Sequence, residues 1–245
     1  APHTNGDFRL RWTTPPPLAN LATYALGAGN ICVACHQARR NVTTYVAGRP
    51  TLTTRWGPHY GTQGDMVIGT NGYEYAGWTY TRTEHRVAAG PTNGKDGCLE
   101  CHFKATSQYV VGGHSFEMRA EANEPLSGVT EVLNVGACTP CHGEIDDFNE
   151  VGPGYSVQDS VDVLVANLKA RLVAAGLVDA TTGLAKATTT SADSAGAVWN
   201  YLVTKYDRSR GVHNAKYTMG LLNSSISYLQ GPVPQRMARL RFARD

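Results

Sequence analysis

The clearest pattern of hydrophobic and polar positions lies toward the C-terminus and predicts helices. Within residues 157–175, apolar side chains recur three or four positions apart, which is the spacing of one face of an amphipathic helix. The apolar positions are Val161, Leu164, Val165, Leu168, Leu172 and Val173. Ser156 is a suitable N-cap for this helix and Gly176 a suitable stop. Two further helices are predicted at residues 194–206 and 213–229, and a polar surface loop precedes them.

The middle of the chain has a different pattern. Residues 41–97 are rich in Thr, Gly and Tyr and show no sustained helical period. Short alternating pieces at residues 73–75 and 78–80 favour brief strands between glycine turns. A segment this long and irregular is unusual inside a compact domain, unless a bound group supplies the apolar surface that it wraps. We therefore expect its aromatic side chains to pack on such a group or on one another: Trp56, Tyr60, Tyr73, Tyr75, Trp78 and Tyr80.

The N-terminal residues complete the expected organisation. Pro15, Pro16 and Pro17 favour extended polyproline geometry, and a short helical turn is expected at residues 18–26. The chain then divides into an N-terminal arm at residues 1–30, a region at 31–150 that holds all the cysteines, and a helical region at 151–245. We expect the helical region to pack on the cysteine-containing one, so that the chain forms one structural unit.

Three pentapeptides carry the strongest chemical signal. The pattern Cys-x-x-Cys-His occurs at residues 32–36, 98–102 and 138–142 and contains all six cysteines. It is the attachment motif of c-type haem, in which two thiols bond the vinyl groups and the adjacent histidine reaches the iron. The sequence therefore predicts three haem c groups. The predicted attachment residues are Cys32, Cys35, Cys98, Cys101, Cys138 and Cys141, and the predicted proximal iron ligands are His36, His102 and His142.

Two other uses of these cysteines explain less of the pattern. Six cysteines in an exported chain could form three disulfides, but such frameworks space their cysteines variously, whereas every pair here has the same gap. Zinc sites also use Cys-x-x-Cys pairs, but zinc does not explain the histidine that follows each pair. Covalent haem explains both features and leaves no thiol for a disulfide.

Five further histidines are candidates for the distal ligands of three irons: His3, His59, His85, His114 and His213. Neutral imidazole is a common iron ligand, and bis-histidine ligation implies low reduction potentials. Methionine is the alternative and would raise the potential, with Met66, Met118, Met219 and Met237 available. His114 follows paired glycines that let the backbone approach a flat ring system, and His213 is expected to open the last helix. His85 and His114 flank the middle motif and are expected to serve different haems.

Charge and hydropathy bear on partners and location. The chain of 245 residues has a net charge of +2 and only 17% charged residues, so nothing favours nucleic acid or an anionic membrane surface as a partner. No apolar run approaches the length of a membrane span. The chain begins Ala-Pro-His rather than with Met, which is typical of a trimmed signal peptide. We expect export to the cell surface or the extracellular space, with the periplasm as the alternative.

Several segments resemble the multihaem c-type cytochromes of metal-respiring bacteria and some archaea. Besides the three pentapeptides, the resemblance rests on residues 56–61 (WGPHYG), 63–66 (QGDM), 112–116 (GGHSF) and 211–217 (GVHNAKY). It implies that His59, His114 and His213 are distal haem ligands. It also implies a mainly irregular/α multihaem cytochrome: a loop-rich, haem-wrapped core with short strands, plus a C-terminal group of about three helices.

Within that group, the chain is similar to small extracellular cytochromes that polymerise into filaments, the so-called nanowires. This resemblance implies a homopolymer with head-to-tail contacts, in contact with other cytochromes. It also implies that one distal ligand, such as His3 on its extended arm, can come from the adjoining subunit. Heterologous contacts of this kind close into a ring or continue as an open filament.

The expected function is electron transfer without catalysis. Roughly eighty residues per haem suggest a body that spaces a row of haems and offers docking surface at both ends. A monomeric periplasmic shuttle, or an electron-transfer subunit of a larger complex, uses the same chemistry with other partners. A multihaem reductase acting on nitrite, hydroxylamine, a sulfur oxyanion or a metal ion is the enzymatic alternative. It needs an open iron coordination position, and the surplus of histidines gives no reason for one.

Overall fold

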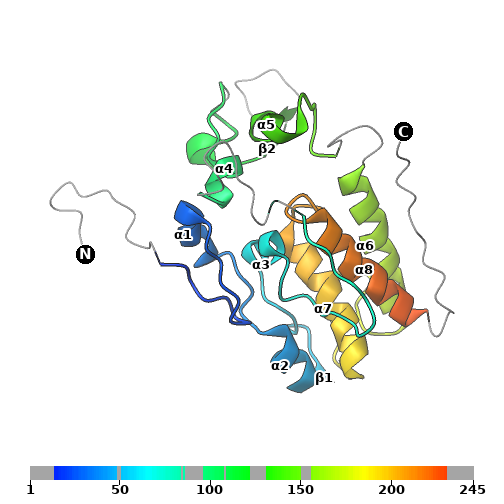
Figure 1. The fold of residues 1–245 in the computed structure, drawn as a ribbon. Helices are drawn as coiled ribbons and strands as arrows, with labels where there is room; N and C mark the ends of the chain where they lie inside the picture. Colours follow the sequence, from blue (N-terminus) through cyan, green and yellow to red (C-terminus); the bar gives the residue numbers. More distant parts are fainter. Residues whose placement is uncertain are drawn as a thin grey trace.

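Three long helices form the larger part of the molecule. The computed structural model describes residues 14–48, 51–83, 85, 96–107, 109–121, 131–149 and 156–230. The helices are α6 (Val157–Ala174), α7 (Ala192–Asp207) and α8 (Ala215–Leu229), and they pack side by side (Figure 1). Their positions confirm the predicted helices to within two residues at each end. Residues 1–13 of the predicted N-terminal arm, with His3, lie outside the described residues, as do residues 231–245.

The start of α8 differs from the prediction. We expected His213 to open this helix, but the helix begins at Ala215 and Asn214 is its N-cap. The Asn214 side chain accepts a hydrogen bond from the Tyr217 amide at 3.3 Å and another from the Thr83 amide at 2.9 Å. Asn214 therefore ends the connection before α8, because a capping side chain satisfies an amide that the first turn leaves unpaired. His213 lies in that connection rather than on the helix.

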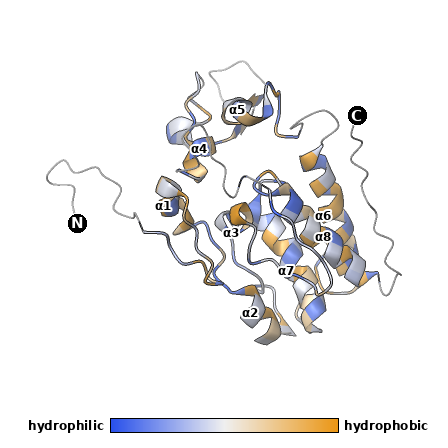
Figure 2. Ribbon diagram, viewed as in Figure 1, coloured by the Kyte–Doolittle hydropathy of each residue, from blue (hydrophilic) through white to orange (hydrophobic). Residues whose placement is uncertain are grey.

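The hydrophobic core joins the three helices to the irregular segment before them. Hydrophobic residues are concentrated along α6, α7 and α8, with a further segment at α3 (Gln63–Ile68) (Figure 2). Trp199 of α7 is fully buried, and its ring lies 6.0 Å from that of Trp56 in an edge-on arrangement. Met66 is also fully buried in this core. Full burial of each large side chain contributes about 1.5–3 kcal/mol, so the core binds residues 42–80 firmly to the helices.

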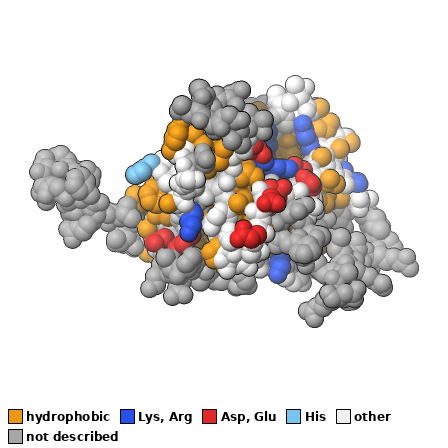
Figure 3. Space-filling view, turned by 90° about the horizontal axis from the view of Figure 1, so that it is seen from above, with side chains coloured by type: hydrophobic (Ala, Val, Ile, Leu, Met, Phe, Trp, Pro, Cys, Tyr) orange, Lys and Arg blue, Asp and Glu red, His pale blue; other side chains and the backbone are white. Residues whose placement is uncertain are grey.

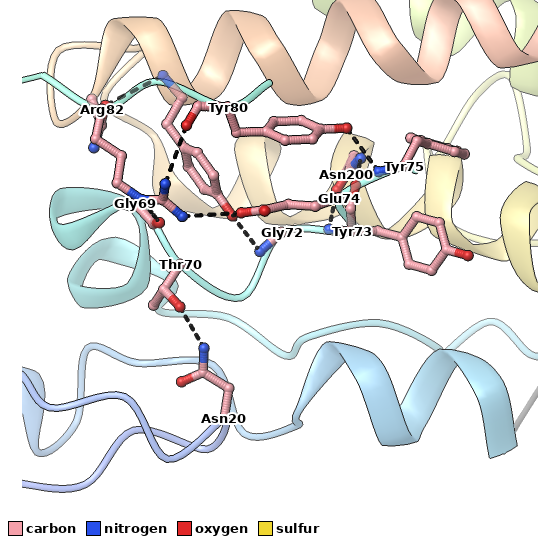
Figure 4. A network of polar contacts seen from close by, with 12 residues as sticks. Asn20, Gly69, Thr70, Gly72, Tyr73, Glu74, Tyr75, Tyr80, Arg82 and Asn200 are labelled. Carbon is pink, nitrogen blue, oxygen red and sulfur yellow. Dashed lines mark hydrogen bonds and ion pairs between the residues drawn. The ribbon is translucent and has the colours of Figure 1, made fainter. Parts of the chain in front are cut away.

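The irregular segment does not form the strands that we predicted at residues 73–75 and 78–80. Its backbone groups bond instead to side chains from the helices and from the segment itself, as Figure 4 shows. The Gly72 amide donates to the Tyr217 hydroxyl at 3.0 Å, and the Tyr75 amide donates to the Tyr80 hydroxyl at 2.8 Å. Asn200 accepts from the Tyr73 amide at 2.7 Å and donates to its carbonyl at 2.9 Å. These bonds replace a β-ladder, so no strand partner is required.

The short strands lie elsewhere. β1 (Thr51–Leu52) pairs antiparallel with β4 (Thr188–Thr189), and β2 (Arg119–Glu121) pairs antiparallel with β3 (Glu131–Leu133). The helical turn expected at residues 18–26 is absent; an isolated bridge joins Pro17 to Thr23, and the 3-10 helix η1 (Gly27–Gly29) follows. Among the described residues, no helix is long and apolar enough to cross a membrane.

The aromatic residues of the irregular segment pack mainly on protein. Tyr80 lies against Tyr217, and Tyr75 stacks on Tyr228 with ring centroids 5.2 Å apart. The ring centroids of Tyr60 and Tyr206 are 4.7 Å apart, and Tyr60 is 62% exposed. Most of these rings thus contact aromatic side chains of α7 and α8, and packing on a bound group stays a prediction.

Candidate functional site

Each cysteine motif forms a short helical turn. The motifs lie on or beside α1 (Asn30–Val33), α4 (Cys98–His102) and α5 (Thr139–His142). In Figure 1, α4 and α5 lie above the helical core, and α1 lies to its left. Residues three apart share one face of a helix, so the two thiols of each motif project together and the histidine follows them. All six cysteines are free thiols in this structure.

The middle motif lies between the other two. The Cys98 thiol hydrogen-bonds to that of Cys32 and lies 3.2 Å from the buried Tyr24 hydroxyl. The bond to Cys32 lowers the pKa of Cys98, although burial opposes the shift. Cys101 interacts electrostatically with Cys138, and burial is the first cause of the raised pKa, about 11, of the Cys101 thiol. The two cysteines of the middle motif therefore approach different neighbouring motifs.

His102, the proximal candidate of the middle motif, faces His213. Their ring centroids are 6.3 Å apart, and the ring planes are inclined at 44°. His102 Nδ1 lies 2.8 Å from the Phe116 carbonyl, and His213 Nδ1 lies 2.6 Å from an Asp207 carboxylate oxygen. Burial lowers the pKa of His213, but the charge and hydrogen bond of Asp207 raise it above its ordinary value overall.

His142, the proximal candidate of the third motif, faces His85. Their ring centroids are 6.1 Å apart with nearly perpendicular planes, at 83°. His85 Nδ1 lies 2.7 Å from the Val212 carbonyl. Burial lowers the pKa of His85, against the effect of the Val212 bond, and this favours the neutral imidazole that metals bind.

Both pairs have the dimensions that an iron between two imidazoles requires. A metal–imidazole bond is about 2.0 Å and the ring centroid lies roughly 1.2 Å beyond the nitrogen, so two imidazoles on opposite sides of one metal would have centroids about 6.4 Å apart. In His102, His213 and His85, an oxygen acceptor lies against Nδ1. This arrangement fixes the neutral tautomer that leaves Nε2 for a metal. The residues present therefore fit axial ligation of haem iron at two of the three motifs.

The first motif has a different environment. His36 Nδ1 lies 3.3 Å from Gln63 Oε1, and α3 lies close to the motif because Gly64 has no side chain. A Cβ at Gly64 would lie only 2.8 Å from a methyl carbon of Val33. Within the described part of the chain, no second imidazole ring faces that of His36. His59, His114 and His3 stay predictions as distal ligands.

The structure places His59 and His114 on the surface. His59 is exposed, with φ at +72°, and its ring lies 5.3 Å from that of Tyr60. His114 is exposed on η3 (Gly113–Ser115), with its ring 5.4 Å from that of Phe103. Figure 3 shows hydrophobic side chains grouped on the upper face of the molecule, with acidic side chains beside them.

The sequence did not indicate a functional role for the four residues whose oxygen atoms face the ring nitrogens of the histidines. They are Gln63, Phe116, Asp207 and Val212. Phe116 and Val212 act through backbone carbonyls, for which no sequence signal exists. Asp207 precedes His213 without a spacing typical of a metal site. Gln63, Phe116 and Val212 lay in segments that the resemblance had marked, whereas Asp207 did not.

One short segment supports ligand candidates of all three motifs. We call residues 207–214 the α7–α8 connection. It carries His213, and its Val212 carbonyl holds His85. Gln63, which contacts His36, donates to the Tyr206 carbonyl at 2.9 Å and to the Asp207 carbonyl at 3.3 Å.

A known protein shares part of this sequence. Over 159 residues, or 61% of this chain, it is 26% identical to the C-type polyheme cytochrome OmcC of Geobacter sulfurreducens. The chain is similar to a multihaem c-type cytochrome. It spans only 19% of the length of OmcC. No protein-family model and no solved structure matches the chain. The similarity supports haem c as the cofactor and electron transport as the class of function.

Proposed function

We propose that this chain transfers electrons through three covalently attached c-type haems with histidine ligands on both sides of each iron. The observation that carries the proposal is the pair of facing imidazoles, His102 with His213 and His85 with His142, at 6.3 and 6.1 Å. Each pair joins a histidine of a Cys-x-x-Cys-His motif to one from a distant segment. Both separations are compatible with two ligands on one metal, which supports the proposal.

Haem c supplies an iron that accepts and releases one electron between its ferric and ferrous states. The residues of the chain determine what surrounds that iron. The motif cysteines would attach the cofactor, and at two of the three motifs the facing imidazoles would leave no coordination position for a substrate. The hydrogen bonds at Nδ1 of His102, His213 and His85 hold the rings still, which reduces the rearrangement that a change of iron charge would cause.

The order of the motifs supports a linear route for electrons. Cys98 contacts Cys32, whereas Cys101 interacts with Cys138, so the middle haem would lie between the other two. An electron entering near residues 32–36 would leave near residues 138–142, or the reverse. Such a route suits a protein that passes electrons between partners at its two ends.

We extend the proposal to an extracellular filament built from head-to-tail copies of the chain, in contact with other cytochromes. Its support is the likeness of the chain to small filament-forming cytochromes, together with the surplus of histidines. His3 of one copy would then be available to the His36 haem of the next. A monomeric periplasmic shuttle is the alternative. Negative-stain electron microscopy of exported protein separates the two, because only the first gives filaments.

A reductase is the enzymatic alternative, and the facing histidines argue against it. The decisive experiment is a pyridine haemochrome assay combined with low-temperature EPR. We expect three c-type haems per chain and only low-spin ferric signals. Two haems or fewer would contradict the haem count, and a high-spin signal in the native protein would support a reductase with an open iron.

A further inference from the structure

Asp207 is an unusual neighbour for a candidate haem ligand. Its side chain is 1% exposed, and one carboxylate oxygen lies 2.6 Å from His213 Nδ1. The other oxygen accepts a hydrogen bond from the Ser209 hydroxyl, which in turn accepts one from the His213 amide at 3.2 Å. Among the described residues, no lysine or arginine forms an ion pair with Asp207. Its negative charge is therefore directed at His213.

The corresponding groups at three other candidate ligands, His36, His85 and His102, are neutral. His85 and His102 face the backbone carbonyls of Val212 and Phe116, and His36 faces the amide oxygen of Gln63 at 3.3 Å. A carboxylate draws the Nδ1 proton more strongly than a carbonyl does, and so makes the opposite ring nitrogen a better electron donor. In addition, a buried negative charge favours the ferric state, which carries one more positive charge than the ferrous state.

We propose that Asp207 is a positioning residue that lowers the reduction potential of the haem attached at Cys98 and Cys101. The inference rests on the proposed function, since it requires His213 to be an axial ligand. The haem in the middle of the row then has a lower potential than it would have with a carbonyl at Asp207's position. Electron transfer through the chain passes over this site, so Asp207 controls the energy of the central step.

The test is a spectroelectrochemical titration of the full haem-loaded protein and of its Asp207→Asn variant. Asparagine keeps the shape and an acceptor oxygen for His213 but removes the charge. We resolve the titration into three one-electron redox components, one for each haem, and expect one of them to move to a more positive potential. The expected shift is about 59 mV, which corresponds to about a tenfold change in the ferrous-to-ferric ratio at a fixed potential. The other two components should stay in place. If all three potentials stay unchanged in an Asp207→Asn variant that keeps three low-spin haems, the inference is overturned.

Two further variants distinguish tuning from a structural role. Asp207→Glu restores the charge and should return the moved component toward the wild-type potential. Ser209→Ala removes a donor to the carboxylate and should move the same component to a more negative potential. If Asp207→Asn fails to hold three haems, the Ser209→Ala variant decides the question. An unchanged potential of the redox component in Ser209→Ala would then overturn the inference. The haem count and EPR of the wild-type protein test the proposed function separately.

Discussion

The Val212 carbonyl lies 2.7 Å from Nδ1 of His85, so the residue beside one candidate ligand holds the ring of another. His213 is the next residue, and it faces a different motif histidine from the one that His85 faces. A displacement of this backbone would therefore disturb two iron sites together. The segment is anchored on one side by α7 and on the other by the Asn214 cap of α8.

Replacement of either distal candidate should open one iron. In His213→Ala or His85→Ala, we expect one of the three haems to become high-spin, because each pair supplies one imidazole to either side of the metal. The measurement is low-temperature EPR with the high-spin signal quantified per haem. The double variant should show two high-spin haems.

Rescue with free imidazole is the control for these variants. Added imidazole should restore the low-spin signal if the loss is confined to the ligand, since the small ring can occupy the position that the side chain left. A His213→Ala variant that keeps three low-spin haems without imidazole would rule out His213 as a ligand.

Arg208 offers a test of the α7–α8 connection that does not touch a ligand. It is exposed and terminates α7 in the left-handed region, with φ at +63°. This conformation costs a residue with a side chain about 1 kcal/mol, and glycine adopts it freely. Arg208→Gly should therefore raise the free energy of unfolding by about 0.5–1 kcal/mol, as measured by urea denaturation.

The matched control is Arg171→Gly in the last turn of α6, where the backbone is helical. Glycine inside a helix lowers the free energy of unfolding by about 1 kcal/mol. The two arginine-to-glycine changes should thus have opposite signs. A loss of stability in Arg208→Gly would show that the arginine side chain contributes more than the strained backbone costs.

The sequence predicted those features that depend on local order. The helix at residues 157–174 is recoverable because its apolar face repeats with the helical period, and the haem motifs because their chemistry needs five consecutive residues. The strands predicted at 73–75 and 78–80 were wrong, and at 73–75 the reason is that Asn200 and Tyr217, far along the chain, bond to the backbone of Tyr73 and of the adjacent Gly72. Tertiary partners of this kind leave no local pattern.

The pairing of the histidines shows the same limit of local information. Sequence reasoning gave His85 and His213 as ligand candidates, but only the fold brings them opposite His142 and His102. The pairs depend on the packing of the α7–α8 connection against the motif helices. The β1–β4 pairing, between Leu52 and Thr188, depends likewise on distant segments and was not predicted.

Gln63 should affect the first haem and the stability of the fold separately. Its amide oxygen faces His36, and its amide nitrogen donates to the Tyr206 carbonyl at 2.9 Å. Gln63→Leu removes both contacts, whereas Gln63→Glu removes the donor and keeps an acceptor. Each variant should lose about 1–2 kcal/mol of unfolding free energy.

The potentials should tell these two variants apart. Loss of the acceptor in Gln63→Leu should move one redox component to a more positive potential, while Gln63→Glu should move the same component the other way. Spectroelectrochemical titration measures both. Equal shifts in the two variants would show that Gln63 acts only through the packing of α3 against α7.

Buried Asp65 predicts a dependence of stability on pH. Burial raises its pKa to about 6, although hydrogen bonds from the Ala38 amide and the Asn71 side chain oppose the shift. An unfolded aspartate has a pKa of about 3.9. The folded state thus holds this proton more tightly, and the stability that it contributes is complete below pH of about 4 and lost as the pH rises through about 6.

Asp65→Asn removes this titration and provides the comparison. The free energy of unfolding of the wild type, minus that of Asp65→Asn, should fall by about 2 kcal/mol between pH 4 and pH 7. Asp179→Asn is the control of opposite sign: hydrogen bonds from the Thr182 amide and hydroxyl lower the pKa of Asp179. Asp179 contributes stability above the unfolded pKa, which is lost as the pH falls. Urea denaturation of the haem-loaded proteins across this range measures both differences, and a difference for Asp65→Asn that rises with pH would show that Asp65 is ionised in the fold at low pH.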